Sequence, residues 1–292
     1  MEPGKHGAAA GEAGRPANPD WTIDQGWNAY TGADHGVWKT LYERQSRLLP
    51  GRACDEFVDG MRQLSMDADK IPDFRRLSDV LMKRTGWQVF AVPGLVPDDV
   101  FFDHLANRRF PAGHFIRKPE ELDYLEEPDV FHDVFGHVPM LVHPVFADYI
   151  QAYGAGGVRA RKLGVLGNLA RIYWYTVEFG LIQGPQGLRI YGSGILSSYT
   201  ETLFALESPS PHRIRFDMER VMRTLYRIDD FQEVYFVISG FEELLELARI
   251  DFGPTYERIK SQAAFAPGAD LPDDVMMTRG TGSYHRAKLR SS

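Results

Sequence analysis

Apolar residues recur at helical spacing along most of this chain, whereas strand-like runs are few and short. Residues 35–49 place apolar and charged positions with the period of a helix. Residues 166–183 form the longest apolar segment, which predicts a buried helix. The clearest strand-like run, residues 87–97, is interrupted by Pro93. Strands and helices do not alternate as in a parallel βαβ sheet, so the pattern predicts a single, mainly α-helical domain with a small β element.

Composition marks the ends of the folded part. Residues 1–20 are rich in Gly, Ala and Pro and lack the apolar run of a signal peptide, so we expect a disordered tail. Residues 21–264 are continuous, without a long linker or an internal repeat, and we expect them to form one domain. Residues 265–292 are rich in Pro, Asp and Gly, and we expect them to wrap the surface or to be disordered.

The overall composition limits the partners of the protein. The chain of 292 residues is 43% hydrophobic, which is enough for a large core. Its formal net charge of -7 argues against a nucleic-acid or anionic-membrane surface. It contains no apolar stretch of about 18 residues, so we expect no membrane span. Cys54 is the single cysteine and has no partner for an internal disulfide, which fits a reducing, cytoplasmic setting.

Two histidines, His132 and His137, lie five positions apart in a strongly apolar segment. On a regular α-helix residues at this spacing point in clearly different directions. Pro128 suits the first turn of a helix and Gly136 the residue just past its end, while Pro139 opposes resumption of the helix. We therefore expect a short helix that stops between the two histidines, so that the second imidazole can turn back beside the first.

A carboxylate in the longest apolar segment is the candidate third member of the site. Glu178 is the only charged residue between Arg171 and Arg189. Such a group is costly to bury unless it is paired or bound to a metal, and an ion pair with Arg117 or Arg171 is the alternative. Two histidines and one carboxylate describe the facial triad of non-haem iron(II) oxygenases, but the same set suits catalytic zinc. Purely structural histidines, without a metal, are the third interpretation.

Three segments together resemble a known family. They are PDVFHDVFGHVPML, IYWYTVEFGLI and YGSGILSSYTE, in this order along the chain. They are similar to the catalytic domain of the pterin-dependent aromatic amino acid hydroxylases, and most of all to the bacterial phenylalanine 4-hydroxylases. The resemblance extends from about Trp21 to about Ile250. It implies the fold of that catalytic domain, and it identifies residues 21–264 as the catalytic domain of this chain.

The resemblance also implies an activity and its cofactors. Ferrous iron would be held by His132, His137 and Glu178, and a tetrahydropterin (tetrahydrobiopterin or a related bacterial pterin) would donate two electrons. The implied reaction is the hydroxylation of L-phenylalanine to L-tyrosine with O₂, in a monomeric enzyme. Tryptophan and tyrosine are the rival substrates within the family.

Further site residues follow from the resemblance alone. The implied pterin contacts are Val92, Gly94, Leu95 and Phe101. The implied substrate contacts are Arg117, which would bind the carboxylate, Ser197, which would assist it, Pro128 and Trp174, which would form the wall of the ring pocket, and Gly194. Without the resemblance, Phe101 and Trp174 would be assigned to the core and Arg117 to the surface. A zinc hydrolase with the same three ligands and Asp133 as a base is the alternative enzyme, but it gives no reason for the aromatic pterin loop and Arg117 to occur together.

Overall fold

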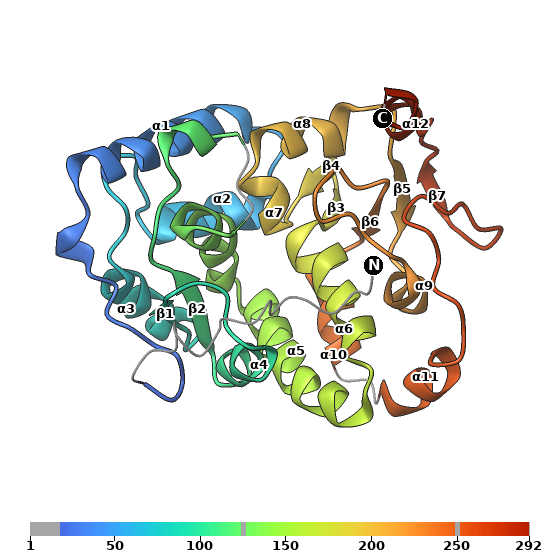
Figure 1. The fold of residues 1–292 in the computed structure, drawn as a ribbon, viewed down its shortest axis with the longest axis horizontal. Coiled ribbons are helices and arrows are strands. Elements are labelled where there is room, and N and C mark those ends of the chain that lie inside the picture. The colour runs from blue at the N-terminus through green and yellow to red at the C-terminus, as the bar shows by residue number, and fades with distance from the viewer. Residues whose placement is uncertain (1–17, 124–126, 249–251, 292) are drawn as a thin grey trace.

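The computed structural model describes residues 18–123, 127–248 and 252–291, and most of them are helical (Figure 1). The predicted mainly α-helical fold with a small β element is confirmed. Most of the segment predicted to be a disordered tail, residues 1–20, lies outside the described residues. Among the helices that are described, none combines the length and the apolarity needed to cross a bilayer.

The α-helices are α1 (Gly32–Leu48), α2 (Asp55–Gln63), α3 (Phe74–Arg84), α4 (Asp98–Ala106), α5 (Pro144–Leu163), α6 (Leu166–Tyr173), α7 (Ser193–Leu196), α8 (Tyr199–Glu207), α9 (Met218–Arg223), α10 (Phe241–Ala248), α11 (Phe252–Ile259) and α12 (Ser283–Ser291). Short 3₁₀ helices are η2 (Trp27–Ala29), η3 (Pro119–Glu121) and η5 (Val138–Val142). Two segments are π-helical, η4 (Phe131–His137) and η6 (Trp174–Glu178).

The strands form two small sheets. They are β1 (Gln88–Val92), β2 (Arg109–Gly113), β3 (Leu181–Gly184), β4 (Gly187–Ile190), β5 (His212–Arg215), β6 (Val234–Ile238) and β7 (Met276–Thr278). β1 and β2 pair with each other, and the other strands form a sheet in the order β4-β3-β6-β5-β7. In the second sheet β6 is parallel to both of its neighbours, and β6 is buried along its whole length.

The expected absence of βαβ units is wrong. β1 pairs with β2 in parallel, with Gln88 opposite Arg109, and α4 connects the two strands. Each strand has five residues, and Pro111 lies within β2, so neither run is long enough to show alternation. A proline is tolerated here because every strand of a two-stranded sheet is an edge strand. The unit matters for function because β1, α4 and β2 carry much of one wall of the cavity described below.

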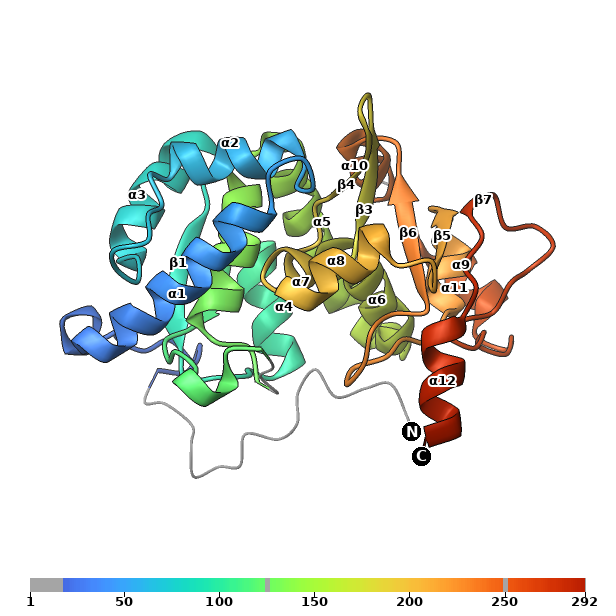
Figure 2. The same cartoon turned by 90° about the horizontal axis from the view of Figure 1, so that it is seen from above.

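The two sheets lie on opposite sides of the molecule, with α5 and α6 between them (Figures 1 and 2). α1, α2 and α3 cover the side of β1 and β2, and one large hydrophobic cluster runs through the whole core. After Phe265, which pairs through its backbone with Arg223 and Leu225, the chain adds β7 to the edge of the larger sheet beside β5. It then forms α12.

Helices α4 and α5 approach each other closely at two glycines of α5. A Cβ atom on Gly154 would lie 2.4 Å from the backbone nitrogen of Ala106, and one on Gly157 would lie 1.9 Å from the ring of Phe102. At Gly154 the obstructing atoms are backbone, which cannot move aside like a flexible side chain. The contact therefore requires glycine, and it fixes α4 against the centre of the fold.

The contact predicts a position-specific effect on stability. Gly154→Ala should lower the free energy of unfolding by about 1–3 kcal/mol or more, the usual cost of overpacking. Gly156→Ala is the matched control, because a Cβ there meets nothing within 4 Å. The control should be neutral or should stabilise by up to about 1 kcal/mol through its helix propensity. Urea unfolding of both variants checks this, and equal midpoints would contradict the packing argument.

Candidate active site

His132 and His137 lie on one continuous helical segment, which corrects the predicted break. Phe131–His137 is π-helical, Gly136 lies inside it, and Pro139 lies in the following 3₁₀ helix η5. A π-helix has hydrogen bonds between residues five apart, and such turns occur often at functional sites. Each turn contains more residues than an α-helical turn, so side chains at i and i+5 face nearly the same way. The unusual spacing is therefore matched by an unusual helix.

Glu178 is the last residue of the second π-helical segment. The predicted long helix over residues 166–183 ends here, because α6 continues into η6 and Leu181 already begins β3. Two glycines let the chain pass close to this turn. A Cβ on Gly192 would lie 2.5 Å from the carbonyl oxygen of Glu178, and one on Gly194 would lie 3.2 Å from both that oxygen and the carboxylate. The carboxylate is thus enclosed by backbone on one side and faces the histidines on the other.

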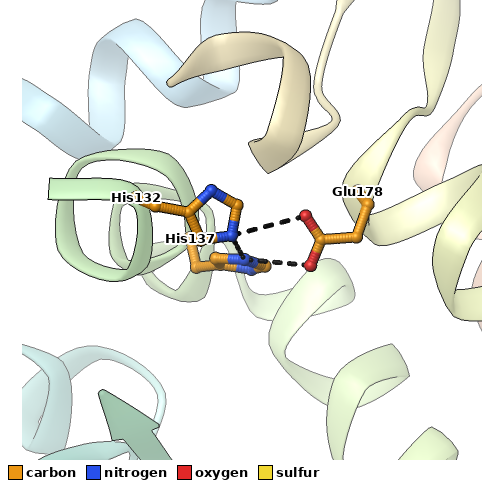
Figure 3. A group of neighbouring side chains, drawn as sticks. All are labelled: His132, His137 and Glu178. Atoms are coloured by element: carbon orange, nitrogen blue, oxygen red, sulfur yellow. Dashed lines mark hydrogen bonds and ion pairs between the residues drawn. The ribbon is translucent and has the colours of Figure 1, made fainter. Parts of the chain in front are cut away.

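The three side chains converge on one point (Figure 3). The Nε2 atoms of His132 and His137 are 3.2 Å apart. The Glu178 carboxylate lies 3.6 Å from the first of them through Oε2 and 3.1 Å from the second through Oε1. One ligand atom from each residue lies within 4.8 Å of the others. Two imidazoles and a carboxylate at this separation form a possible iron site.

The alternative ion-pair partners of Glu178 are engaged elsewhere. Arg117 forms a bidentate pair with Asp129. Arg171 donates from Nη1 to the carbonyl oxygen of Met222, 2.8 Å away. The predicted alternative, an ion pair of Glu178 with Arg117 or Arg171, is therefore wrong.

The surroundings prepare His132 to bind a metal. Its Nδ1 lies 3.0 Å from Ser197 Oγ, which itself donates to the carbonyl oxygen of Ser193 at 2.8 Å. Because the serine proton is used there, Ser197 accepts from Nδ1–H, and the Nε2 lone pair points toward Glu178. Burial lowers the pKa of His132 to about 4, so the imidazole is neutral, as a metal ligand must be.

His137 has the opposite shift. Burial acts to lower its pKa, but the charge of Glu178 and the hydrogen bond to it outweigh burial and raise the pKa. A proton on Nε2 of His137 would lie between the imidazole and the carboxylate, and metal binding would displace it. The donor set therefore fits a divalent metal ion.

A buried carboxylate next to this centre organises the neighbouring arginine. Asp129 is fully buried and accepts from Nε and Nη2 of Arg117 at 2.8 and 2.9 Å. It also accepts from the backbone N–H groups of Arg117 and His132, both at 3.0 Å. Burial acts to raise the pKa of Asp129, but the Arg117 guanidinium and these hydrogen bonds hold it below its ordinary value. One charged group thus fixes both an arginine and the backbone of a metal-site histidine.

Two further carboxyl groups face the same space. Burial raises the pKa of Asp133 and of Glu201 to about 7 each. Asp133 accepts from the Gly113 N–H at 2.7 Å, which ties η4 to β2. Glu201 accepts from the hydroxyl of Tyr235. Both carboxyl groups can hold a proton near neutral pH.

The three metal-site residues, together with Arg117, Asp133, Ser197 and Glu201, line one cavity of about 720 Å³. Every site residue expected from the sequence lies in its wall: His132, His137, Glu178, Val92, Gly94, Leu95, Phe101, Arg117, Pro128, Trp174, Gly194 and Ser197. They come from elements far apart in the chain, and the fold brings them together.

The sequence did not reveal several residues that shape the site. Asp129, the buried partner of Arg117, was missed because an aspartate after a proline is most often solvated. Tyr284 and Lys288 of α12 line the cavity, although their segment was expected to be a tail that wraps the surface or is disordered. Phe231 and Asp230 line it as well, in a loop with no motif. The one sequence signal for a packed surface there is the aromatic content of residues 226–236.

Comparison with known proteins assigns the family. Residues 27–261 match the profile of the biopterin-dependent aromatic amino acid hydroxylases. The chain belongs to this family. The predicted resemblance and the predicted fold of the hydroxylase catalytic domain are thereby confirmed, and with them the family's use of a pterin.

Several individual relatives are bacterial proteins. The chain is 66% identical to a phenylalanine-4-hydroxylase of Caulobacter vibrioides, over 93% of this chain and 92% of that protein. It is 56% identical to the phenylalanine-4-hydroxylase of Chromobacterium violaceum, over 89% of this chain and 88% of that protein. A crystal structure of phenylalanine hydroxylase from C. violaceum with bound iron and phenylalanine superposes with a TM-score of 0.86, at 54% identity, covering 90% of this chain and 96% of that one.

The geometry of the hydroxylase predicts which residues retain iron. Glu178→Ala and His137→Ala should each abolish stoichiometric iron binding, because each removes one of three converging ligands. Neither change should unfold the protein, since replacing Glu178 also removes a buried charge. Iron content after anaerobic reconstitution, measured beside the far-UV circular dichroism, checks this. Glu246→Ala, on the exposed side of α10, is the control. Unchanged iron content in both site variants would contradict the assignment.

Proposed function

We propose that this chain is an iron- and tetrahydropterin-dependent monooxygenase that converts L-phenylalanine to L-tyrosine with O₂. The observation that carries the proposal is the convergence of His132, His137 and Glu178 in a cavity that is also lined by Arg117, whose guanidinium is oriented by the buried Asp129. A metal centre and a carboxylate-binding arginine in one enclosed space suit an amino acid substrate. The names of the bacterial relatives support phenylalanine within the family's range.

The three ligands would hold ferrous iron and leave further coordination positions open. When bound, iron and a reduced pterin supply the electrons and the oxygen activation that the protein cannot provide. The protein itself orients the metal-binding groups and excludes water from the cavity. Ser197 fixes the tautomer of His132, and the backbone around Gly194 encloses Glu178. Both restrict the metal-binding groups to one arrangement.

The pterin would lie against the wall formed by β1 and α4. Phe101 offers an aromatic face, and its ring is fixed by edge contacts to Phe102 and Tyr173, with centroids 5.8 and 5.7 Å away. The backbone of the turn before α4 borders the same space and would provide hydrogen bonds to the pterin ring. The residues assigned to this wall are Val92, Gly94, Leu95 and Phe101.

The substrate carboxylate would bind Arg117. The pair with Asp129 engages Nε and Nη2, and Nη1 takes part in none of those bonds. A guanidinium held in this way is oriented in advance for a second carboxylate. To assist Arg117 in binding the substrate carboxylate, Ser197 would have to turn its hydroxyl away from the Ser193 carbonyl oxygen. We therefore assign Ser197 first to the orientation of His132.

The aromatic ring would lie between Pro128 and Trp174, with Gly194 on the adjoining wall. Trp174 is held by a stacked Tyr226, at a centroid distance of 4.3 Å and an angle of 16°. A large and fixed indole at this wall favours the smaller phenyl ring of phenylalanine over the indole of tryptophan.

The test is product formation by the purified protein with ferrous iron, a tetrahydropterin, O₂ and an amino acid. Phenylalanine, tryptophan and tyrosine are supplied in parallel. We expect tyrosine from phenylalanine only when all four components are present. Turnover of tryptophan alone would overturn the substrate assignment. Hydrolysis by the zinc-loaded protein, without consumption of oxygen, would favour the metallohydrolase instead.

Substrate binding predicts a selective effect of Arg117. Arg117→Ala should raise the KM for phenylalanine by roughly 10²-fold or more, as loss of a charged hydrogen-bonded pair of about 3 kcal/mol implies. The KM for the pterin should change little. Arg189→Ala, on β4 and away from the residues that line the cavity, is the control. A phenylalanine KM within about twofold of the parent would contradict the role.

We further propose that the hydroxylase is a cytoplasmic monomer. The single cysteine, Cys54, is buried and packs in the core, as suits a reducing compartment. Light scattering on the purified protein tests the oligomeric state, and a mass of twice the chain mass of 33.1 kDa would overturn it.

A further inference from the structure

One part of the cavity wall comes from a loop between α9 and β6. We call residues 227–232 the rim loop. Ile228, Asp229, Asp230 and Phe231 all line the cavity. The side chain of Ile228 is 73% exposed at its edge, whereas Gln232 at the other end of the loop is only 1% exposed. The loop therefore runs from solvent into the core along the cavity.

Gln232 connects the rim loop to the ring pocket. Its Oε1 accepts from the indole Nε1 of Trp174 at 3.1 Å and from the backbone N–H of Arg227 at 3.2 Å. Its Nε2 donates to the carbonyl oxygen of Arg227 at 2.7 Å. The amide thus closes the loop on itself and holds the polar edge of Trp174. A displacement of the loop would carry the acceptor of that indole with it.

Helix α12 holds the rim loop from the other side. The hydroxyl of Tyr284 donates to Oδ1 of Asp230 at 3.0 Å, and Nζ of Lys288 donates to Oδ2 at 2.9 Å. His285 Nε2 lies 2.9 Å from the carbonyl oxygen of Phe231. Three contacts from little more than one turn of α12 thus fix a loop that is more than 50 residues away in sequence.

Aromatic packing also holds the rim loop and α12 against α8. Phe231 stacks on Phe204 with centroids 4.2 Å apart and an angle of 12°. Tyr284 lies against both rings, at 5.2 and 5.3 Å. In Figure 1, α12 lies at the C-terminal corner of the molecule, beyond the end of α8. The helix is therefore packed in place, and Tyr284 and Lys288 themselves border the cavity.

We propose that α12 is a positioning element of the active site, in which Tyr284 and Lys288 hold Asp230 and thereby fix the rim loop, Gln232 and the indole of Trp174. The inference rests on the proposed function, in which Trp174 walls the ring pocket. Its consequence is that the catalytic unit extends beyond residues 21–264 to the C-terminal helix, and that substrate ranking depends on residues that touch neither iron nor pterin.

The ion pair is suited to positioning and contributes little to stability. The side chain of Lys288 is 57% exposed and that of Asp230 is 14% exposed. Because the lysine end of the pair is open to solvent, and Asp230 keeps hydrogen bonds from Tyr284 and from the Phe231 N–H, loss of the lysine alone should change the free energy of folding little. Removing the pair should therefore leave a folded enzyme whose loop is less restrained. The effect should appear in substrate binding and ranking, not in the unfolding midpoint.

The experiment compares Lys288→Met, and the double variant Lys288→Met/Tyr284→Phe, with the parent holoenzyme. We expect the KM for phenylalanine to rise by about 3-fold to 30-fold, the range for coupling through supporting residues. The preference for phenylalanine over tryptophan should fall, and less tyrosine should form per pterin oxidised. The KM for the pterin and the iron content should stay unchanged. Amide hydrogen exchange of residues 227–232 should become faster.

Two controls separate positioning from general surface effects. Lys260→Met removes another exposed ion pair, with Glu257, whose lysine is 54% exposed. It should change none of these quantities. Lys288→Arg keeps the charge and should restore the KM and the preference.

The outcomes separate the inference from the function on which it rests. A parent enzyme that hydroxylates no aromatic amino acid would overturn the proposed function, and with it this inference. An active parent whose KM and substrate preference are unchanged in both α12 variants, even with faster exchange in the loop, would overturn the inference alone. If the double variant does not fold, Lys288→Met by itself decides, because its side chain lies at the surface.

Discussion

The carboxylate of Asp129 couples the two halves of the active site. It is buried without exposure to solvent, and its four hydrogen bonds reach the guanidinium and backbone of Arg117 and the backbone of His132. A buried charge of this kind is stable only if every partner is in place, and removal of one partner typically costs about 3–5 kcal/mol. The start of the π-helical turn and the position of the arginine therefore depend on each other. Whatever holds the metal ligands in register also holds the group assigned to the substrate carboxylate.

The rest of the site is built around that fixed point by close backbone contacts. Gly136 in η4 faces the carbonyl oxygen of Ser193, 2.8 Å from where a Cβ would lie, and Gly192 approaches Glu178 in the same way. These contacts press α7 between the two π-helical segments. Ser197, at the end of α7, is thereby brought to the Nδ1 atom of His132. Small residues and one hydroxyl group set the orientation of the ligands, while the aromatic residues fill the space around them.

The sequence predicted well what depends on local chemistry. The helical period of residues 35–49 shows why: nearly all of this segment lies in α1, and its apolar residues Val37, Leu41 and Leu48 are among those that the helix buries. The three metal-site residues could be found because charged and imidazole groups are rare in apolar segments. The π-helical turn could not, since a spacing of five fits a broken helix equally well. Asp129 and α12 depend on contacts between segments, and no local pattern encodes the partner of Asp230 at position 288.

The π-helical form of η4 makes the spacing of its two histidines sensitive to chain length. A π-turn differs from an α-turn by roughly one additional residue, and on an α-helix each residue rotates the side-chain direction by about 100°. Deleting one residue between His132 and His137 would let the segment relax to an ordinary helix with a spacing of four, whereas adding one would turn an imidazole out of the cavity. A point substitution at Val134 or Phe135 preserves the number of residues between the two ligands, whereas an insertion or a deletion does not. The length of this segment is therefore as strict a requirement as the glycine at position 136.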